Sequence, residues 1–279
     1  MARIGIHLSY WQRRWDDPLP PLVARAAAAG FDGVEVPLLN PQALPLAEIR
    51  AAAQASGVSV TCGTGLGPAT DLSSPDPAVR RAGLEHMKRC LEAAASLGAP
   101  GVGGVTYAAW GLTSPPEGKA ARREQAVAAM RQLAAEAEQM GLTIFLEMLN
   151  RFEGCLIGSV EEGKAFVAAV GSPAVQLHLD TFHLNIEADD IGQAIRLAGA
   201  DLGHFHLSEN NRRLPGYGHI PWSSVAAALH DAEYHGPLVV ESFVTPDCEV
   251  GAGLNIWRSL GADLDGEAAA SVRFLREHF

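Results

Sequence analysis

The chain has 279 residues, 48% of them hydrophobic, which is enough to bury one sizeable core but little for a second. We therefore expect residues 1–279 to form a single catalytic domain. Because 21 Lys and Arg oppose 32 Asp and Glu, the formal net charge of −11 disfavours nucleic-acid binding. The apolar run at the N-terminus is too short for a signal sequence or a membrane span. Four cysteines without a C-x-x-C pair suggest free thiols, and we expect a cytoplasmic protein.

Short β-branched or apolar runs alternate with longer stretches rich in Ala, Leu, Glu and Arg that have a helical period. The short runs predict strands at residues 3–7, 33–36, 58–61, 101–105, 142–147, 175–180, 202–206 and 237–241. The longer stretches predict helices near residues 19–29, 46–56, 76–98, 117–140, 159–170, 189–199, 222–232 and 253–277. Eight strand–helix units in series, without G-x-G-x-x-G after the first strand, favour a single (β/α)8 TIM barrel over a doubly wound open sheet.

Several predicted boundaries carry turn or capping signals. Ser74-Pro75-Asp76 combines a helix cap, a proline for the first turn and an acid near the positive end of the helix dipole. Ser159 and Glu162 form a capping box. Left-handed helix ends are predicted at four glycines, namely Gly30, Gly57, Gly141 and Gly236. The run Gly63-Thr-Gly65-Leu-Gly67 only loosely resembles a phosphate-binding loop and is more typical of a turn with positive φ.

Ionisable side chains stand at the ends of the last four predicted strands, one per strand: Glu147, Asp180, His206 and Glu241. Because the C-terminal ends of barrel strands meet at one rim, we expect these side chains to face a shared pocket. An acid at a strand end is often only a helix cap or an ion-pair partner, but four in consecutive units favour a common site. Three carboxylates and one imidazole suit Mn²⁺, Mg²⁺ or Co²⁺, and a cation would relieve the repulsion between the carboxylates.

Further polar side chains follow the same strands by a few residues. Glu153, His183 and Arg212 lie where substrate contacts are expected, although each also fits a solvated loop charge or a packed helix-start residue. His178 and His204 stand earlier in two of the strands, on the same face as the strand-end residues. We interpret this pair as hydrogen-bonded core histidines rather than as additional ligands.

Aromatic residues gather in the predicted loops after the first, fourth and eighth strands: Tyr10, Trp11, Trp15, Tyr107, Trp110 and Phe243. Flat apolar walls of this kind suit the C–H faces of a sugar and help to exclude water. Residues packed beneath long loops would look the same in a sequence, so both interpretations stay open. Trp15, Trp110 and Phe243 are our candidates for the wall of a substrate pocket.

Three longer runs carry a family resemblance. They are Leu146-Glu-Met-Leu-Asn-Arg-Phe-Glu153, Leu179-Asp-Thr-Phe-His-Leu-Asn-Ile-Glu187, and Gly203-His-Phe-His-Leu-Ser-Glu-Asn-Asn-Arg212 followed by Pro215-Gly-Tyr-Gly. Shorter matches are Tyr10-Trp11 with Trp15, Gly30-Phe31-Asp32 with Glu35, Ser74-Pro75-Asp76, Ala109-Trp110 and Glu241-Ser-Phe243. Together they resemble the ketose 3-epimerases, the D-tagatose, D-allulose (psicose) and L-ribulose 3-epimerase group within the xylose isomerase-like barrels. The likeness covers nearly the whole chain.

The resemblance implies one divalent metal per subunit, commonly Mn²⁺ or Co²⁺ and alternatively Mg²⁺, held by the four strand-end side chains. It implies that Glu153, His183 and Arg212 hold the C1–C3 end of a ketose, and that the enzyme forms homodimers or homotetramers. Two pocket positions depart from the family pattern: His7 stands where an aromatic residue is usual, and Gly63 where a small or sulfur-bearing residue is common. These departures leave the preferred ketose open.

Epimerisation at C3 requires a proton taken from one face of the carbon and returned to the other, which two carboxylates can do. Our hypothesis gives these roles to Glu147 and Glu241, with the cation stabilising a cis-enediolate. The lack of a convincing phosphate cradle favours free ketoses.

Three alternatives use the same barrel. An aldose–ketose isomerase or a hydroxypyruvate isomerase-like enzyme is the nearest, because moving a proton between C1 and C2 needs similar groups. A DNA repair enzyme like endonuclease IV would need more histidine ligands and a basic groove. A sugar-binding barrel without activity is the non-enzymatic alternative.

Overall fold

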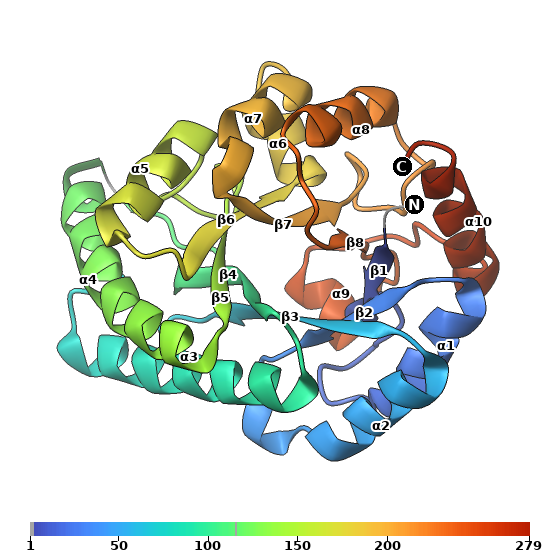
Figure 1. Ribbon diagram of the computed structural model, residues 1–279, viewed down its shortest axis with the longest axis horizontal. Helices are drawn as coiled ribbons and strands as arrows, with labels where there is room; N and C mark the ends of the chain where they lie inside the picture. Colours follow the sequence, from blue (N-terminus) through green and yellow to red (C-terminus); the bar gives the residue numbers. More distant parts are fainter. Residues whose placement is uncertain (1–2, 115) are drawn as a thin grey trace.

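Eight parallel strands form a closed barrel in the computed structural model, which describes residues 3–114 and 116–279. Each strand pairs with its neighbours in chain order, and β8 closes on β1 (Figure 1). The strands are β1 (Ile4–His7), β2 (Gly33–Pro37), β3 (Ser59–Leu66), β4 (Gly101–Ala109), β5 (Thr143–Glu147), β6 (Val175–Asp180), β7 (Leu202–Leu207) and β8 (Leu238–Val240). The predicted (β/α)8 TIM barrel is confirmed.

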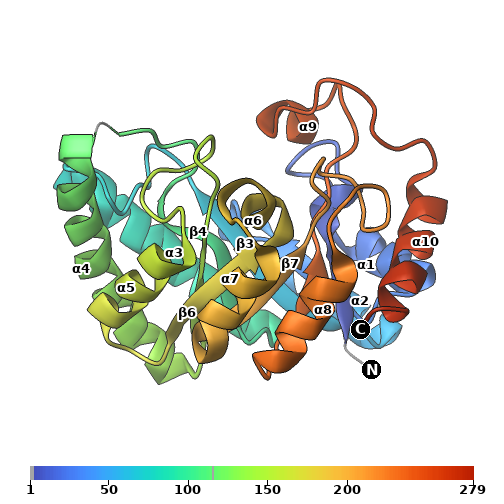
Figure 2. The ribbon, with the colours of Figure 1, turned by 90° about the horizontal axis from the view of Figure 1, so that it is seen from above.

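Helices surround the barrel and bury their apolar faces against it. The outer helices are α1 (Pro20–Ala29), α2 (Leu46–Ser56), α3 (Pro77–Leu97), α4 (Pro116–Met140), α5 (Val160–Val170), α7 (Ile191–Ala198), α8 (Trp222–Asp231) and α10 (Leu264–Arg276). The shorter elements are η1 (Leu8–Tyr10), η2 (Pro41–Ala43), α6 (Thr181–Glu187), η3 (Gly199–Asp201) and α9 (Glu249–Gly253). Figure 2 shows α9 at the end of the barrel opposite the C-terminus. None of the described helices is both long enough and apolar enough to cross a membrane.

Most of the predicted capping signals are confirmed. Ser159 caps α5 by accepting a hydrogen bond from the Glu162 backbone N–H. Three of the predicted glycine ends have φ between +66° and +101°, namely Gly30, Gly57 and Gly141. The prediction for Gly236 is wrong, because α8 ends at Asp231 and Glu233, with φ of 51°, takes the left-handed position instead.

One predicted helix cap and one predicted helix are also wrong. The cap of α3 is Asp76 rather than Ser74, because the Asp76 side chain accepts a hydrogen bond from the Ala78 backbone N–H at 2.8 Å. The predicted helix over 253–277 is two helices separated by a loop. Asn255 adopts a left-handed φ of 59° soon after α9, and Asp263 caps the later start of α10.

The glycine-rich run of β3 differs from its prediction. Gly63 and Gly65 are strand residues without positive φ, so the predicted turn is wrong here. Gly63 is required for a different reason. A Cβ at this position would lie only 2.9 Å from Glu35 Oε1 on the neighbouring strand, too close for a real contact. The missing side chain therefore makes room for a carboxylate inside the barrel.

Candidate active site

Four side chains converge at the C-terminal ends of β5 to β8, and they are the four predicted ligands: Glu147, Asp180, His206 and Glu241. One ligand atom of each lies within 4.8 Å of those of the other three. Three of the residues are at most 6% exposed, so their charges are shielded from water. Asp180 also caps α6 through the Phe182 backbone N–H, so the capping role and the cluster role coexist in one side chain. Three oxygens and one nitrogen form a donor set suited to Mn²⁺, Mg²⁺ or Co²⁺.

The orientation of His206 provides a test of whether a cation fits. Its Nε2 lies 2.8 Å from Glu35 Oε1, while Nδ1 lies 3.6 Å from Glu241 Oε1. Nδ1 is buried and has no hydrogen-bond partner among the described residues. A neutral imidazole that donates through Nε2 carries its lone pair on Nδ1. Burial acts to lower the pKa of His206, but Glu35 and Glu241 raise it well above its usual range, so a cation would have to displace a proton from the ring. Once neutral, the ring presents Nδ1 to the carboxylate cluster, as a metal ligand requires.

The carboxylates of the cluster differ in their affinity for protons. Burial and the charge of Glu241 raise the pKa of Glu147 well above its usual range. Burial also acts to raise the pKa of Glu241, but His206 and Arg212 hold it below the usual range. Burial raises the pKa of Asp180 to about 6 in spite of Arg212. Ionising all three carboxylates at once is therefore unfavourable in the protein alone. A bound cation would make it favourable by supplying positive charge.

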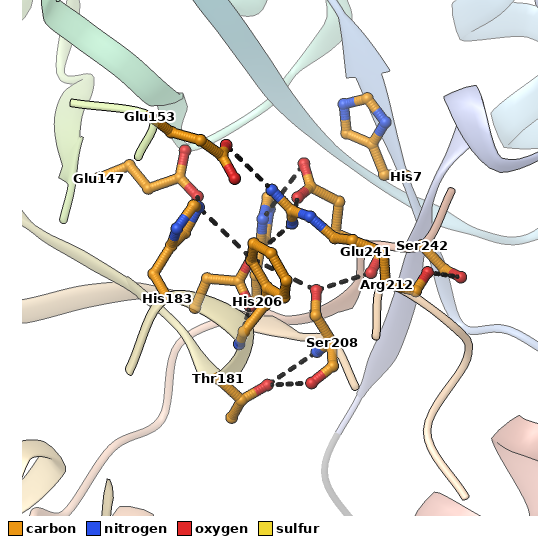
Figure 3. A network of polar contacts seen from close by, with 12 residues as sticks. His7, Glu147, Glu153, Thr181, His183, His206, Ser208, Arg212, Glu241 and Ser242 are labelled. Atoms are coloured by element: carbon orange, nitrogen blue, oxygen red, sulfur yellow. Dashed lines mark hydrogen bonds and ion pairs between the residues drawn. The ribbon is translucent and has the colours of Figure 1, made fainter. Parts of the chain in front are cut away.

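Arg212 reaches into the cluster from the loop between β7 and α8 (Figure 3). Its Nη1 lies 2.8 Å from Glu241 Oε2 and 3.2 Å from Asp180 Oδ2, and its Nη2 lies 3.4 Å from Glu153 Oε2. The centre of the guanidinium lies 3.8 Å from the ring centroid of Phe182. One planar group therefore connects two predicted metal ligands with a predicted substrate residue.

The backbone of Arg212 is strained, with a left-handed φ of 62° that costs a non-glycine residue about 1–2 kcal/mol. Three hydrogen bonds hold it there. Its carbonyl accepts from Ser242 Oγ at 2.7 Å and from the Phe243 N–H at 2.9 Å, and its own N–H donates to the Glu209 carbonyl at 3.0 Å. The surrounding loop therefore aims the guanidinium into the pocket at the expense of local strain.

Asn150, which sequence analysis missed, connects His183 with Glu153, and Glu153 in turn contacts Trp110. The Asn150 backbone N–H donates to His183 Nδ1 at 3.1 Å, so the proton of the neutral ring lies on Nε2, which is 3.6 Å from Glu147 Oε1. The Asn150 side chain donates to Glu153 Oε1 at 3.0 Å, and Trp110 Nε1 donates to Glu153 Oε2 at 3.0 Å. In the sequence, the role of Asn150 was indicated only by its position between the two candidate site residues Glu147 and Glu153.

The cluster opens into a cavity of about 340 Å³, at the lower end of the range for small-molecule sites. All of the residues predicted to contact substrate line it, namely His7, Trp15, Gly63, Trp110, Glu153, His183, Arg212 and Phe243. The other candidate aromatic residues are buried in the core instead, namely Tyr10, Trp11 and Tyr107. A larger cavity of about 1150 Å³ lies at the opposite end of the barrel, and none of the predicted site residues contributes to its described lining.

A fifth carboxylate, Glu35 on β2, lies against His206 and was also missed as a site residue. It is fully buried, and its Oε2 lies 2.8 Å from His204 Nε2 and 2.9 Å from Thr61 Oγ1. Burial acts to raise the pKa of Glu35, but His206 and His204 lower it to well below the usual range. An acidic residue within an otherwise apolar strand was the only signal in the sequence.

The interpretation of His178 and His204 as hydrogen-bonded core histidines holds in part for His178 and is wrong for His204. Both are buried, and His178 Nδ1 accepts from the Gly104 N–H at 3.1 Å. His178 Nε2 and both ring nitrogens of His204 have no hydrogen-bond partner in the described part of the chain, although His204 Nε2 lies 2.8 Å from Glu35 Oε2. The two rings cluster with His206 closely enough to suggest a second cation site. However, the Gly104 contact leaves the proton of a neutral His178 ring on Nε2, so that nitrogen has no lone pair for a cation.

Comparison with known proteins assigns the class. Residues 23–278 match the family model of the xylose isomerase-like TIM barrels. A D-psicose 3-epimerase of Agrobacterium fabrum is 39% identical, over 98% of this chain and 97% of that protein. An L-ribulose 3-epimerase of Methylomonas sp. is 34% identical, over 99% and 97% respectively. A crystal structure of a D-psicose 3-epimerase in the presence of D-fructose superposes with a TM-score of 0.94 at 38% identity, covering 99% of both chains.

The fold and the site at the C-terminal ends of its strands thus define a xylose isomerase-like barrel. Within that class the chain belongs to the ketose 3-epimerase family, and it is an isomerase.

Proposed function

We propose that the protein is a metal-dependent 3-epimerase of free ketoses, such as D-allulose and D-fructose, D-tagatose and D-sorbose, or L-ribulose and L-xylulose. The observation that carries the proposal is the compact group of three carboxylates and one imidazole that borders the cavity. Two of the relatives are named as a D-psicose 3-epimerase and an L-ribulose 3-epimerase, and these names support ketoses as the class of substrate. Because side chains from all eight strand–helix units line the cavity, residues 1–279 serve as one catalytic domain in this proposal.

The proposed cation is Mn²⁺ or Co²⁺, with Mg²⁺ as the alternative, held by Glu147, Asp180, His206 and Glu241. When bound, it supplies a Lewis acid that stabilises negative charge on the substrate oxygens. The unpartnered buried Nδ1 of His206, which faces the carboxylates, and the raised pKa of Glu147 support this assignment.

Glu147 and Glu241 are the proposed proton-exchange pair. Figure 3 shows Glu147 beside Glu153 and His183, and Glu241 on the other side of the cluster. In each direction one carboxylate removes the C3 proton and the other delivers a proton to the opposite face. Their pKa values are shifted in opposite directions, which is the pattern expected when one group holds a proton while the other is ionised.

The remaining polar groups position the ketose. His183 Nε2–H and the Arg212 guanidinium are donors directed at the cavity, where they orient O1 and O2 and share developing negative charge. Glu153, with its carboxylate oriented by Asn150 and Trp110, accepts hydrogen bonds from substrate hydroxyls. Trp15, Trp110 and Phe243 provide apolar walls that limit the access of water.

The deciding experiment is an NMR assay of solvent-deuterium exchange at C3 across a panel of ketoses. We expect exchange together with formation of the C3 epimer, loss of both on chelation, and recovery with Mn²⁺. Formation of an aldose would instead identify the aldose–ketose isomerase alternative. Tight ketose binding without exchange in the presence of Mn²⁺ would identify a sugar-binding barrel. Assembly as a homodimer or homotetramer and a cytoplasmic location stay predictions, the first of which sedimentation analysis checks.

Metal affinity should depend strongly on pH. A cation must displace the protons that burial favours on Asp180, whose pKa is raised to about 6, and on Glu147, whose pKa is raised well above its usual range. We expect the Kd for Mn²⁺ to be at least about tenfold lower at pH 7.5 than at pH 5.5, because one displaced proton gives about tenfold per pH unit below its pKa. Calorimetry in two buffers of different ionisation enthalpy counts the protons. A pH-independent Kd without proton release would contradict the prediction.

The same shift predicts the stability of the metal-free protein. Since the folded-state pKa of Asp180 exceeds its unfolded value, the native state binds more protons between these two values. The contribution of Asp180 to stability therefore declines as the pH rises from about 4 to about 6. Chelated protein should accordingly gain more in Tm from added Mn²⁺ at pH 7.5 than at pH 5.5.

His7 should contribute to substrate preference. Its Nδ1 accepts from the Ser9 N–H at 3.4 Å and burial lowers its pKa, so a neutral ring presents Nε2–H at the cavity wall. We expect His7→Phe to raise KM about 2- to 10-fold for ketoses whose hydroxyls reach this wall, the value of one neutral hydrogen bond, with kcat little changed. His7→Gln, which keeps a donor, is the matched control. Equal KM changes for ketohexoses and shorter ketopentoses would show that His7 does not discriminate.

A further inference from the structure

We propose that Glu35 is a positioning residue for the metal centre, acting through His206: it accepts the Nε2–H of that ring and thereby directs Nδ1 at the carboxylate cluster. The inference rests on the metal-dependent function proposed above. In this proposal Glu35 lies outside the proposed ligand set, but it decides which nitrogen of His206 is available to the cation.

The contacts of Glu35 divide between its two oxygens. Oε1 accepts from His206 Nε2 at 2.8 Å, whereas Oε2 lies 2.8 Å from His204 Nε2 and accepts from Thr61 Oγ1 at 2.9 Å. Thr61 and His204 thus contact one oxygen of the carboxylate, and His206 contacts the other. The contact links β2 with β7 across the barrel, between residues 171 positions apart in the chain.

The ring of His206 needs such a partner. A free neutral imidazole exchanges its proton between two nitrogens, and only one of the two tautomers leaves a lone pair on Nδ1. The acceptor at Nε2 selects that tautomer, as carboxylates do for histidine ligands in general. The ring plane is restrained separately, because His178 packs against it at a centroid distance of 4.1 Å and an angle of 82°.

A purely structural role does not account for Glu35. A buried carboxylate is costly unless it is well paired, and a core in which a whole buried ion-pair group is replaced by well-packed hydrophobic residues is often as stable or more stable. Within the described part of the chain, the ion-pair partners of Glu35 are histidines alone, with His7 Nε2 more distant at 4.0 Å. The absence of a side chain at Gly63 keeps the space for its Oε1 open. The contacts of Glu35 and the open space beside Gly63 thus place a hydrogen-bond acceptor opposite His206 Nε2.

The test compares three variants of the full chain by their affinity for Mn²⁺, measured by competition with a chromogenic chelator. Glu35→Leu removes the acceptor and should weaken Mn²⁺ binding by about 10- to 100-fold, the usual loss when the hydrogen-bond partner of a metal ligand is removed. Glu35→Gln keeps an acceptor oxygen and should recover most of the affinity. Thr61→Val removes only the donor to Oε2 and is the matched control, expected to stay within about twofold of the wild type.

An independent readout is the downfield proton resonance of His206 Nε2–H in the Mg²⁺-loaded protein, which is diamagnetic. This resonance should persist in Glu35→Gln and Thr61→Val and disappear in Glu35→Leu. A folded Glu35→Leu protein with wild-type affinity for Mn²⁺ and an unchanged resonance would overturn the proposal.

Two further outcomes are distinguished by the same experiment. If Glu35→Leu does not fold, Glu35→Asp takes its place, because it keeps the charge but withdraws the carboxylate by about 1.5 Å. Its affinity for Mn²⁺ should fall in the same direction, and wild-type affinity would again overturn the proposal. Failure of the wild-type protein to bind Mn²⁺ would refute the proposed metal site instead, and the proposed role of Glu35 with it.

Discussion

Glu147→Gln and Glu241→Gln should each abolish the interconversion of C3 epimers, with kcat lowered at least about 10³-fold, because proton transfer by a positioned side chain contributes about 10²–10⁴-fold and each change also weakens a metal ligand. Both carboxylates belong to the cluster at the mouth of the barrel. The measurement is epimer formation at saturating Mn²⁺, with the metal content of each variant determined.

Deuterium exchange separates the two roles. A variant with one remaining carboxylate can still exchange the C3 proton of the epimer whose hydrogen faces that group. We therefore expect any residual exchange in the two variants to involve opposite epimers. Glu153→Gln is the matched control, since it makes the same isosteric change in the same cavity outside the predicted ligand set, and it should mainly raise KM. Near-normal epimerisation by either ligand variant would refute the paired-carboxylate scheme.

Arg212→Lys should lower kcat/KM by about 10²-fold, because a lysine ammonium cannot reproduce the planar, forked donors of a guanidinium. The guanidinium contacts Asp180, Glu153 and Glu241 at once and stacks on an aromatic ring, and a point charge satisfies these contacts only in part. Arg212→Met should lose more activity, because it removes the positive charge as well.

Metal affinity distinguishes this explanation from simple disruption of the site. Arg212 is a cation already paired with two predicted metal ligands, so Arg212→Met should leave Mn²⁺ binding unchanged or tighter while activity falls. Arg213→Lys is the control, because this neighbour stacks on Tyr217 and does not line the cavity. It should keep activity within about twofold, as is usual for changes away from a site. Weaker Mn²⁺ binding by a folded Arg212→Met protein would show that Arg212 supports the metal site instead.

The strands of the barrel were predictable because they are buried on both faces and therefore form continuous apolar runs. The positions of Glu147, Asp180 and His206 followed from the same property, since an ionisable residue at the end of such a run has to lie at the rim. Glu241 was placed correctly at the rim although β8 is shorter than predicted and ends at Val240. The cap prediction for α3 failed although the bounds of the helix were predicted closely, because Asp76 offers the cap in place of Ser74.

Asn150 and Glu35 escaped sequence analysis because their roles depend on partners that are distant in the chain. Asn150 fixes the tautomer of His183, which follows the next strand, and Glu35 contacts His206 from the far side of the barrel. Neither residue has a spacing or a motif that reveals such a partner. The left-handed backbone of Arg212 was equally hidden, because arginine has no intrinsic preference for that conformation.

The order of apolar and ionisable residues by itself determined the barrel and the set of side chains that meet at its mouth, because burial and strand direction are local consequences of that order. Tertiary structure alone decided which polar group each ring nitrogen of His183 and His206 contacts, in which direction the pKa of each carboxylate shifts, and where Arg212 points. These properties arise from hydrogen bonds and charges that act over a few ångströms between strands and loops far apart in the chain. Only closure of the barrel brings those groups within reach of one another.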